Sequence, residues 1–296
     1  MSTLLLDELT KLVARHAAAD GTAKPLPGLV LATAYAPTPL TAYVAEPVFS
    51  LVVQGSKRVL LGDRVFDYAA GEYLVVTVDL PVNGHITLAD SEAPFLGIGI
   101  TLKPDVIAAL LLETGLARPT GAEPSGIAIS QSTSDLLDPI VRLLRLLDRP
   151  GDIPVLAPAI EREILWRLIN GPQSFMVRQL GLADSHLAQI GRAVRWIRTH
   201  YTDPFKVEDL ASMVGMSTTS FHRHFLRITS FSPLRYQKQI RLQEARARLL
   251  ATSDDVATVG FAVGYGSPSQ FSREYRRMFG VPPGQESTSH RNREEG

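Results

Sequence analysis

Cysteine is absent from the 296 residues of this chain, and so are long apolar runs. Without cysteine, disulfides, thiolate zinc sites and catalytic cysteine nucleophiles are excluded. No stretch approaches the roughly 18 consecutive apolar residues that a membrane-spanning helix needs. The N-terminal segment carries acids at Asp7 and Glu8 and lacks a long apolar core, which argues against a signal peptide. We therefore expect a soluble, cytoplasmic protein without a membrane partner.

Net charge is also missing, because 30 basic and 30 acidic residues cancel. The balance conceals a separation along the chain. Residues 1–177 hold 13 basic and 19 acidic residues, a net charge of −6. Residues 178–283 hold 15 basic and 8 acidic residues, a net charge of +7. An acidic half joined to a basic half indicates that only the second half meets a polyanion.

The first third of the chain is typical of short β-strands. Its apolar segments are rich in Val, Ile, Leu and aromatic residues, and Gly, Asp, Asn and Pro separate them. Their spacing favours a sandwich or a small barrel. The strands that we expect are 47–53, 57–62, 64–68, 72–80, 85–89 and 94–102.

Helical spacing of apolar residues replaces this pattern after Pro104. The sequence Gly-Pro-Gln at 171–173 ends one helical stretch and a fresh one starts near Ser185, so a domain boundary is expected between 171 and 184. The helices expected before the boundary are 105–113, 135–148 and 157–170.

Two segments of the basic half repeat one pattern at an offset of 49 positions. VEDLASMVG (207–215) aligns with VATVGFAVG (256–264), and their apolar residues match on one helical face. A turn that contains glycine follows in each copy, and then a second helix with two aromatic residues. The aromatic pairs are Phe221 with Phe225 and Phe271 with Tyr275. This arrangement indicates two helix–turn–helix units.

The second helix of each unit has a clear start. Ser267 is a good N-cap, and Pro268 stands at the first helical position, where its missing N–H costs nothing. Gln270 stands at the third position and completes a capping box. Ser217 is the corresponding cap of the earlier copy.

A recognition helix presents its N-terminal residues to base edges in the major groove. Arginine pairs well with guanine, glutamine with adenine and hydroxyl groups with either, whereas arginines one turn further on suit phosphates. Two roles stay open for Gln270: hydrogen bonding to an adenine base, or closing the capping box without contact to DNA. The residues that we expect to contact DNA are Ser217, Thr218, Thr219, His222, Arg223, Arg227, Ser267, Ser269, Gln270, Ser272, Arg273, Arg276 and Arg277.

A long helix is expected between the two units, at 233–250. If this helix holds the units rigidly, one chain reaches two successive major-groove segments, roughly 34 Å apart. Its arginines Arg241, Arg246 and Arg248 are expected to face solvent or DNA.

With these motifs, residues 185–283 resemble the DNA-binding domain of the AraC/XylS family of bacterial transcription regulators. The most specific part is GYGSPSQFSREYRRMFGVPP at 264–283. The resemblance implies sequence-specific binding to an operator on double-stranded DNA. Two positions depart from the family: Lys206 stands where a capping Ser or Thr is frequent, and Thr219 where some relatives carry a large aromatic residue.

The segment at 51–84 resembles the cupin-like N-terminal domain of one AraC subgroup. The resemblance implies an α+β protein, with a cupin-like β-barrel and helices followed by an all-α domain of two helix–turn–helix units. It also implies a small-molecule effector or control of assembly, and RNA polymerase as a partner if the protein is an activator. The expected divisions are a regulatory and dimerisation domain at 1–172, a linker at 173–184, the DNA-binding domain at 185–285 and a flexible tail at 286–296.

The family often dimerises through a helix after the barrel, which corresponds here to 135–148. Its apolar residues extend beyond a single helical face. Two roles of this helix stay open: it covers the barrel, or it forms the interface of a homodimer. The excess of apolar residues favours the homodimer interface. A charge at Leu144 is then expected to give monomers with a folded barrel.

A mostly apolar effector is expected in the barrel, because its strands offer many apolar side chains and few charges. Alternation of the strand residues does not decide which of them fill the barrel and which line a cavity. Tyr43, Tyr73 and His85 are candidates for the polar contacts. The complete set of ligand-binding candidates is Tyr43, Phe49, Leu51, Val53, Tyr73, Val75, His85 and Ile98.

Catalytic cupins carry clustered histidines with a glutamate, whereas His85 is the only histidine in the β region here. We therefore expect no metal, no cofactor and no enzyme activity. A cupin-type enzyme fused to a DNA-binding domain is the less favoured alternative. A ligand-independent regulator with a structural N-terminal domain is another, and the sequence does not separate it from an effector-controlled regulator.

Overall fold

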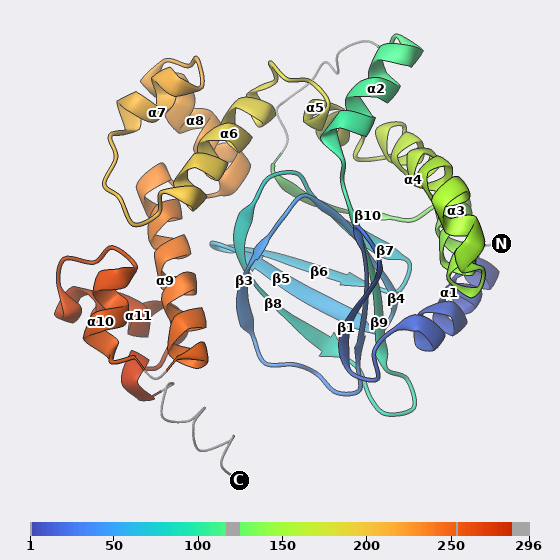
Figure 1. The fold of residues 1–296 in the computed structure, drawn as a ribbon, viewed down its shortest axis with the longest axis horizontal. Helices are drawn as coiled ribbons and strands as arrows, with labels where there is room; N and C mark the ends of the chain where they lie inside the picture. The colour runs from blue at the N-terminus through green and yellow to red at the C-terminus, as the bar shows by residue number, and fades with distance from the viewer. Residues whose placement is uncertain (1, 117–124, 253, 286–296) are drawn as a thin grey trace. The chain divides into compact units, whose positions relative to one another are not determined.

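The computed structural model describes residues 2–116, 125–252 and 254–285. By its internal contacts the chain divides into two compact units, residues 1–191 with 227–230 and residues 192–226 with 231–296. The described residues of the first unit form ten strands and several helices, and those of the second form helices (Figure 1). The α+β class expected from the sequence is confirmed, with the sheets in the first part and the helices in the second.

Two antiparallel sheets form the centre of the first unit. The larger sheet has the order β1-β2-β9-β4-β7-β10, and the smaller has the order β3-β8-β5-β6. The strands of the larger sheet are β1 Gly21–Leu26, β2 Leu29–Ala34, β9 Phe95–Thr101, β4 Val48–Gln54, β7 Glu72–Val76 and β10 Ile127–Gln131. Those of the smaller are β3 Thr41–Ala45, β8 Leu80–Leu88, β5 Ser56–Leu61 and β6 Arg64–Ala69.

Each strand expected between 47 and 102 overlaps an observed one, with one division that the pattern did not show. The expected strand 72–80 ends at Val76, and β8 starts at Leu80 in the other sheet. Strands β1, β2, β3 and β10 were not expected. β1 contains Pro25, which has no backbone N–H to donate. This suits the position of β1 at the edge of the larger sheet, because one side of an edge strand has no partner strand.

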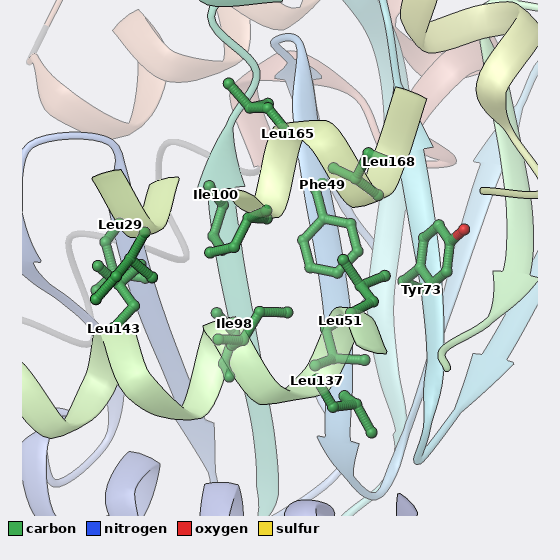
Figure 2. Close-up of a cluster of buried hydrophobic side chains, with 14 of the residues drawn as sticks. Leu29, Phe49, Leu51, Tyr73, Ile98, Ile100, Leu137, Leu143, Leu165 and Leu168 are labelled. Carbon is green, nitrogen blue, oxygen red and sulfur yellow. The ribbon is translucent and has the colours of Figure 1, made fainter. Parts of the chain in front are cut away.

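Helices cover one face of the larger sheet (Figure 1). Leu9, Leu12 and Val13 of the first helix are buried in a core that also contains Leu137 and Leu168. Figure 2 shows strand side chains of this core pointing toward the helices that carry Leu137, Leu143, Leu165 and Leu168. The helices are α1 Ser2–His16, α2 Pro104–Thr114, α3 Ser134–Arg145, α4 Ile153–Ile169 and α5 Ser174–Leu180, with two short 3-10 turns at Leu146–Asp148 and Pro150–Asp152.

The apolar stripe of α3 is buried within the chain. Leu137, Ile140 and Leu144 have no exposed surface, and Leu143 is 1% exposed. Packing against α1, α4 and the sheet explains why the stripe is wider than one face. The expectation that a charge at Leu144 leaves a folded monomer is therefore wrong, because that side chain lies in the core rather than on an outer surface.

The segment expected to be a linker, 173–184, contains the helix α5. Met176 and Val177 of α5 are buried in the core of the first unit. The contacts of the chain change from the first unit to the second only after Gly191, inside α6 (His186–Thr199). The division therefore lies further along the chain than the break at 171–173 indicated.

In the described residues, five helices follow α6, and together with the end of α6 they form the second unit, except for the last residues of α8, which belong to the first. The expected pairs are present, and each expected second helix starts within a residue or two of its cap. In the described parts of the chain there is no helix both long and apolar enough to cross a membrane. The expected tail at 286–296 lies outside the described residues. The helices are α7 Val207–Met213, α8 Thr218–Thr229, α9 Pro233–Ala251, α10 Val256–Ala262 and α11 Pro268–Phe279.

Candidate nucleic-acid interface and effector site

The first helix of each pair ends in the same left-handed turn. Gly215 follows α7 with a φ of 75°, and Gly264 follows α10 with a φ of 92°. Met216 donates its N–H to the carbonyl of Ala211 at 2.9 Å, and the equivalent bond after Gly264 measures 3.0 Å. This is the Schellman arrangement, in which a residue without a Cβ takes the left-handed position and the last carbonyls are satisfied. The repeat seen in the sequence is thus a repeat of backbone geometry.

Two glycines of the second pair allow close contacts that a side chain would block. A Cβ on Gly260 would lie 2.9 Å from a ring carbon of Phe271, so α10 and α11 cross closely there. A Cβ on Gly264 would lie 2.6 Å from the carbonyl oxygen of Thr202. In the first pair Ala211 occupies the position of Gly260, as the alignment of the two copies predicts.

The aromatic pairs fix both second helices on α9. Phe221 and Phe225 are fully buried with ring centroids 5.4 Å apart, and Phe225 meets Tyr236 of α9 edge-on at 5.7 Å. In the second pair Phe271 and Tyr275 are fully buried at 5.6 Å. They share a core with three residues of α9: Leu242, Ala245 and Leu249. One helix therefore carries both units, as expected for a linking helix.

Serine hydroxyls cap both second helices. Ser217 Oγ accepts a hydrogen bond from the N–H of Ser220 at 3.3 Å, and Ser267 Oγ accepts one from the N–H of Gln270 at 3.4 Å. The side chain of Gln270 does not close the expected capping box. Its Nε2 donates instead to Glu274 Oε1, one turn along α11, at 3.3 Å. The side chain of Gln270 is thus held by Glu274, a partner that neither of the two roles left open for Gln270 involves.

Glu274 is a site residue that the sequence analysis missed. Its carboxylate accepts hydrogen bonds from Lys238 Nζ and from the hydroxyl of Tyr265, each at 2.9 Å. Burial raises the pKa of Glu274, but the hydrogen bonds from Lys238, Gln270 and Tyr265 outweigh it and leave that pKa below its usual range. The signal available was the spacing of Gln270 and Glu274 by four residues, which places them side by side on a helix.

Most of the residues expected to contact DNA face solvent on the two second helices. Their exposure is what a recognition surface requires, and DNA contact itself stays a prediction. The exposed residues are Ser217, Thr219, His222, Arg223, Arg227, Ser269, Gln270, Arg273, Arg276 and Arg277, and the half-buried ones are Thr218, Ser267 and Ser272.

Arg241 does not face solvent or DNA as expected. Its guanidinium donates to the carbonyl oxygens of Tyr201 at 2.6 Å, Gly264 at 2.8 Å and Thr202 at 3.0 Å. Burial lowers the pKa of Arg241, and the three carbonyls satisfy its donors. The expectation was wrong because helical spacing does not show that a loop 40 residues upstream packs on this face of α9.

Three polar side chains of the smaller sheet lie on its face toward the larger sheet. The hydroxyl of Tyr68 is 3.2 Å from Ser50 Oγ of β4, which joins the two sheets. Lys57 is paired directly with Tyr68 across β5 and β6, so both side chains lie on the same face. The ammonium of Lys57 lies 5.6 Å from the ring centroid of Tyr43. Gly84 leaves room for that ring, since a Cβ there would lie 3.0 Å from it.

Lys57 is the charged member of this group. Burial lowers the pKa of Lys57, but Tyr68 and Tyr43 outweigh burial and leave it above the ordinary value. The side chain is therefore an ammonium at neutral pH. Across the ranges that the structure describes, no carboxylate forms an ion pair with it. A half-buried cation without a counter-charge attracts an anionic group, because its desolvation is otherwise uncompensated.

Most of the apolar ligand-binding candidates lie on the other face of the larger sheet, under the helices (Figure 2). Side chains of a strand alternate between its faces, and only one face meets the smaller sheet. The expectation that these residues fill the barrel or line a cavity in it is therefore corrected, and ligand binding at them stays a prediction. The residues are Phe49, Leu51, Val53, Tyr73, Val75 and Ile98.

His85 does not lie on the sheet face that carries Tyr43 and Lys57. It is paired with Arg58 across the strands, and Arg58 directly follows Lys57 and therefore points to the opposite face. The guanidinium of Arg58 donates to both carboxylate oxygens of Asp67, at 2.6 and 2.9 Å. His85 helps to lower the pKa of Asp67, although the hydrogen bond from Arg58 is the larger cause. Among the residues that the structure describes, no three His, Asp or Glu side chains are grouped to hold a metal ion.

Two family models match the chain. Residues 25–176 match the N-terminus of AraC-type transcriptional regulators, and residues 210–288 match a helix-turn-helix domain. The transcriptional activator RhaS of Salmonella agona is 29% identical over 167 residues, which cover 55% of this chain and 57% of RhaS. The chain thus spans little more than half the length of the curated relatives that it matches.

Solved structures of ToxT from Vibrio cholerae share the fold at low sequence identity. An apo variant of ToxT superposes with a TM-score of 0.54 and 10% identity, covering 89% of this chain and 98% of that one. Wild-type ToxT with a bound unsaturated fatty acid gives 0.53 and 9%, covering 88% and 94%. The first family match alone spans more than half of the residues, and the chain therefore belongs to the family of AraC-type transcriptional regulators.

Proposed function

We propose that this chain binds a specific operator in double-stranded DNA through both helix–turn–helix units and regulates transcription in response to a small molecule. The observation that carries the DNA-binding part is the common attachment of α8 and α11 to α9 through buried aromatic rings. Rigid attachment lets two recognition helices enter successive turns of the major groove. The net charge of +7 over 178–283 supplies the attraction to phosphate.

The test is footprinting of the full chain on DNA from its own promoter region. Two protected major-groove segments are expected, about one helical turn apart. A chain with both Arg223→Ala and Arg273→Ala is expected to lose the footprint and to keep weak non-specific binding. Absence of binding at low salt, or protection of a single segment, would overturn the two-unit reading.

The curated relative RhaS is described as a transcriptional activator. We extend this to the present chain as a proposal: it acts in the cytoplasm as an activator that contacts RNA polymerase. A homodimer is part of the same proposal, but its interface is not the apolar stripe of α3, which is buried within the chain. Sedimentation at micromolar concentration tests it, and a monomer would refute it.

For the effector, Lys57 between the two sheets points to a molecule with an acidic group. Tyr43 and Tyr68 flank the ammonium and offer hydroxyl groups, while no carboxylate in the described chain competes for it. ToxT, which shares the fold alone, has been crystallised with an unsaturated fatty acid. Fatty acids are therefore a reasonable first probe for this chain.

Thermal unfolding of the full chain with a medium-chain fatty acid and with the matching alcohol tests this site. The acid is expected to raise the unfolding midpoint more than the alcohol does. Lys57→Met should remove the difference, whereas Lys11→Met on the exposed side of α1 should leave it unchanged. If neither compound stabilises the chain or alters operator affinity, the ligand-independent regulator becomes the better reading.

A further inference from the structure

A pocket lies outside the two sheets, beside the ends of β7 and β10. It has a volume of about 460 Å³ and is lined by residues of these strands, the start of α3 and the end of α4. Tyr73 belongs to its wall and lies on the helix-covered face of the larger sheet, opposite to the face that carries Ser50. This pocket is therefore separate from the group around Lys57. Volumes of this size accommodate small molecules.

Two aromatic side chains form the apolar part of the pocket. Tyr73 packs on Phe49 with ring centroids 5.0 Å apart, and Figure 2 shows its hydroxyl pointing away from the apolar cluster. Burial raises the pKa of Tyr73, although a hydrogen bond to Ser130 opposes this, so the phenol stays neutral. Trp166 packs against the same core and stays half-buried. Within the described chain its indole N–H has no hydrogen-bond partner, although such groups usually find one when buried.

The rim of the pocket carries charges of both signs that are loosely paired. Arg167 lies 3.7 Å from Asp135 and 3.5 Å from Glu163, and both separations exceed the 2.7–2.9 Å of a charge-assisted hydrogen bond. The side chain of Asp135 is 71% exposed and that of Arg167 is 40% exposed. Both groups therefore keep hydrogen-bonding capacity for a ligand.

From this arrangement we infer that the pocket binds a small zwitterionic aromatic molecule of the aromatic amino acid class. The ring packs against Trp166 and Tyr73, the carboxylate meets Arg167, and the ammonium meets Asp135. A ligand with both charges replaces the loose Arg167–Asp135 pair on each side, whereas a ligand with one charge leaves the other group without a partner.

The ligand would bridge three elements near the end of the first unit. Gly171 and Pro172 line the pocket directly after α4, and Gln173 donates its side-chain N–H to Ser130 Oγ of β10 at 2.6 Å. Filling the pocket thus holds the end of α4 to β10 and to the start of α3. The role of the ligand as an effector rests on the proposed function, whereas its binding does not.

The tryptophan content of the chain makes binding measurable without DNA. The chain has two tryptophans, and Trp196→Phe leaves Trp166 as the single indole fluorophore. Titration of this full-length variant with L-phenylalanine is expected to change its fluorescence saturably. L-Alanine, which lacks the ring, should have no effect, and 3-phenylpropionate and 2-phenylethylamine, which each lack one charge, should bind more weakly.

Substitutions at the rim separate the two charge contacts. Arg167→Gln should weaken L-phenylalanine and 3-phenylpropionate by about tenfold or more and leave 2-phenylethylamine unchanged. Asp135→Asn should weaken the binding of 2-phenylethylamine and leave that of 3-phenylpropionate unchanged. Arg162→Gln, on the same helix but outside the pocket lining, is the matched control and should change nothing. No fluorescence change with L-phenylalanine, or equal losses in the control, would overturn the site. Operator affinity measured with and without L-phenylalanine tests only the effector role.

Discussion

At the scale of single residues, Gly264 is required for two reasons. Its φ of 92° is a conformation that side chains avoid, and a Cβ there would approach the carbonyl of Thr202 to 2.6 Å. Gly280, at the end of α11, has a φ of 81° but open space around it. The two positions therefore separate backbone strain from a steric clash.

We expect Gly264→Ala to destabilise the second unit by more than the roughly 1–2 kcal/mol of left-handed strain alone. Gly280→Ala should cost no more than that strain. Urea denaturation of the two full-length variants gives the comparison. Equal losses of unfolding free energy in the two variants would show that the loop around Thr202 moves away freely and that the steric clash does not contribute.

The exposed arginines differ in what they are expected to read. Arg223 and Arg273 lie at matching positions about halfway along α8 and α11, and Arg276 lies one turn closer to the end of α11. Because base edges are reached from the N-terminal part of a recognition helix, the first two arginines are the better placed for base contacts. Arg223→Ala and Arg273→Ala should each reduce discrimination against altered sites by roughly 1–3 kcal/mol, each in its own half of the operator. Arg276→Ala should weaken all sequences alike. The test is the affinity of each protein variant for a set of operators that differ by single bases. If all three arginine variants bind every operator uniformly more weakly, the arginines contact only the DNA backbone.

At the scale of elements, the two helix–turn–helix units differ at their first helix. Asp255 caps α10 by accepting the N–H groups of Ala257 at 2.8 Å and Thr258 at 3.0 Å. Lys206 precedes α7 and makes no side-chain cap. The hydrogen bond from the Thr258 hydroxyl is the largest cause that keeps the pKa of Asp255 below its usual range, and backbone N–H groups add to it.

Because the pKa of Asp255 is lowered in the folded chain, its charge stabilises the fold above the unfolded pKa of about 3.9. This contribution is lost as the pH falls through the lower folded value. Asp255→Ala should therefore lower the unfolding midpoint at neutral pH, and the gap to wild type should narrow in acid. Asp255→Asn retains a cap without titrating. A gap that does not change between neutral and acid pH in the alanine variant would contradict this account.

The helix α3 is a core element. Leu144 has no exposed surface and belongs to the cluster shared with the larger sheet. Leu144→Ala should cost about 2–5 kcal/mol, as large-to-small changes in cores do. Val155, which is 74% exposed on α4, is the control, and its change to alanine should stay within about 0.5 kcal/mol. Thermal unfolding of the full chain measures both, and a small effect at Leu144 would show that α3 is loosely packed.

At the scale of the whole molecule, the net charge is −6 over 1–177, +7 over 178–283 and −1 over 284–296. Only the basic part is expected to exchange counterions with DNA, so operator affinity should fall linearly with salt on a logarithmic scale. Arg276→Ala should reduce that slope by about one. Lys11→Ala, in the acidic part, should leave it unchanged. A slope that does not respond to Arg276 would remove this residue from the phosphate contacts.

Much of the helical half was predictable because its signals are local. The glycine turns after α7 and α10, the serine caps and the aromatic pairs all act within a few residues, and the two copies support each other. Arg241 and Glu274 were not predictable in their roles. The partners of Arg241 come from a distant loop, and Lys238, which pairs with Glu274, comes from another helix. A pattern along one helix contains no information about these contacts, although spacing does place Gln270 beside Glu274.

The sequence by itself determined most of the strand segments between 47 and 102, the repeated helix pairs and the division of charge, since each depends on residue type and spacing along the chain. The division of 72–80 between two sheets was not among them. Only the tertiary structure decided which face of each strand meets the helices. For that reason Phe49 and Ile98 lie in the helix-covered core, while Lys57 lies between the sheets. Alternation separates the two faces of a strand but does not label them, because the label depends on what packs there.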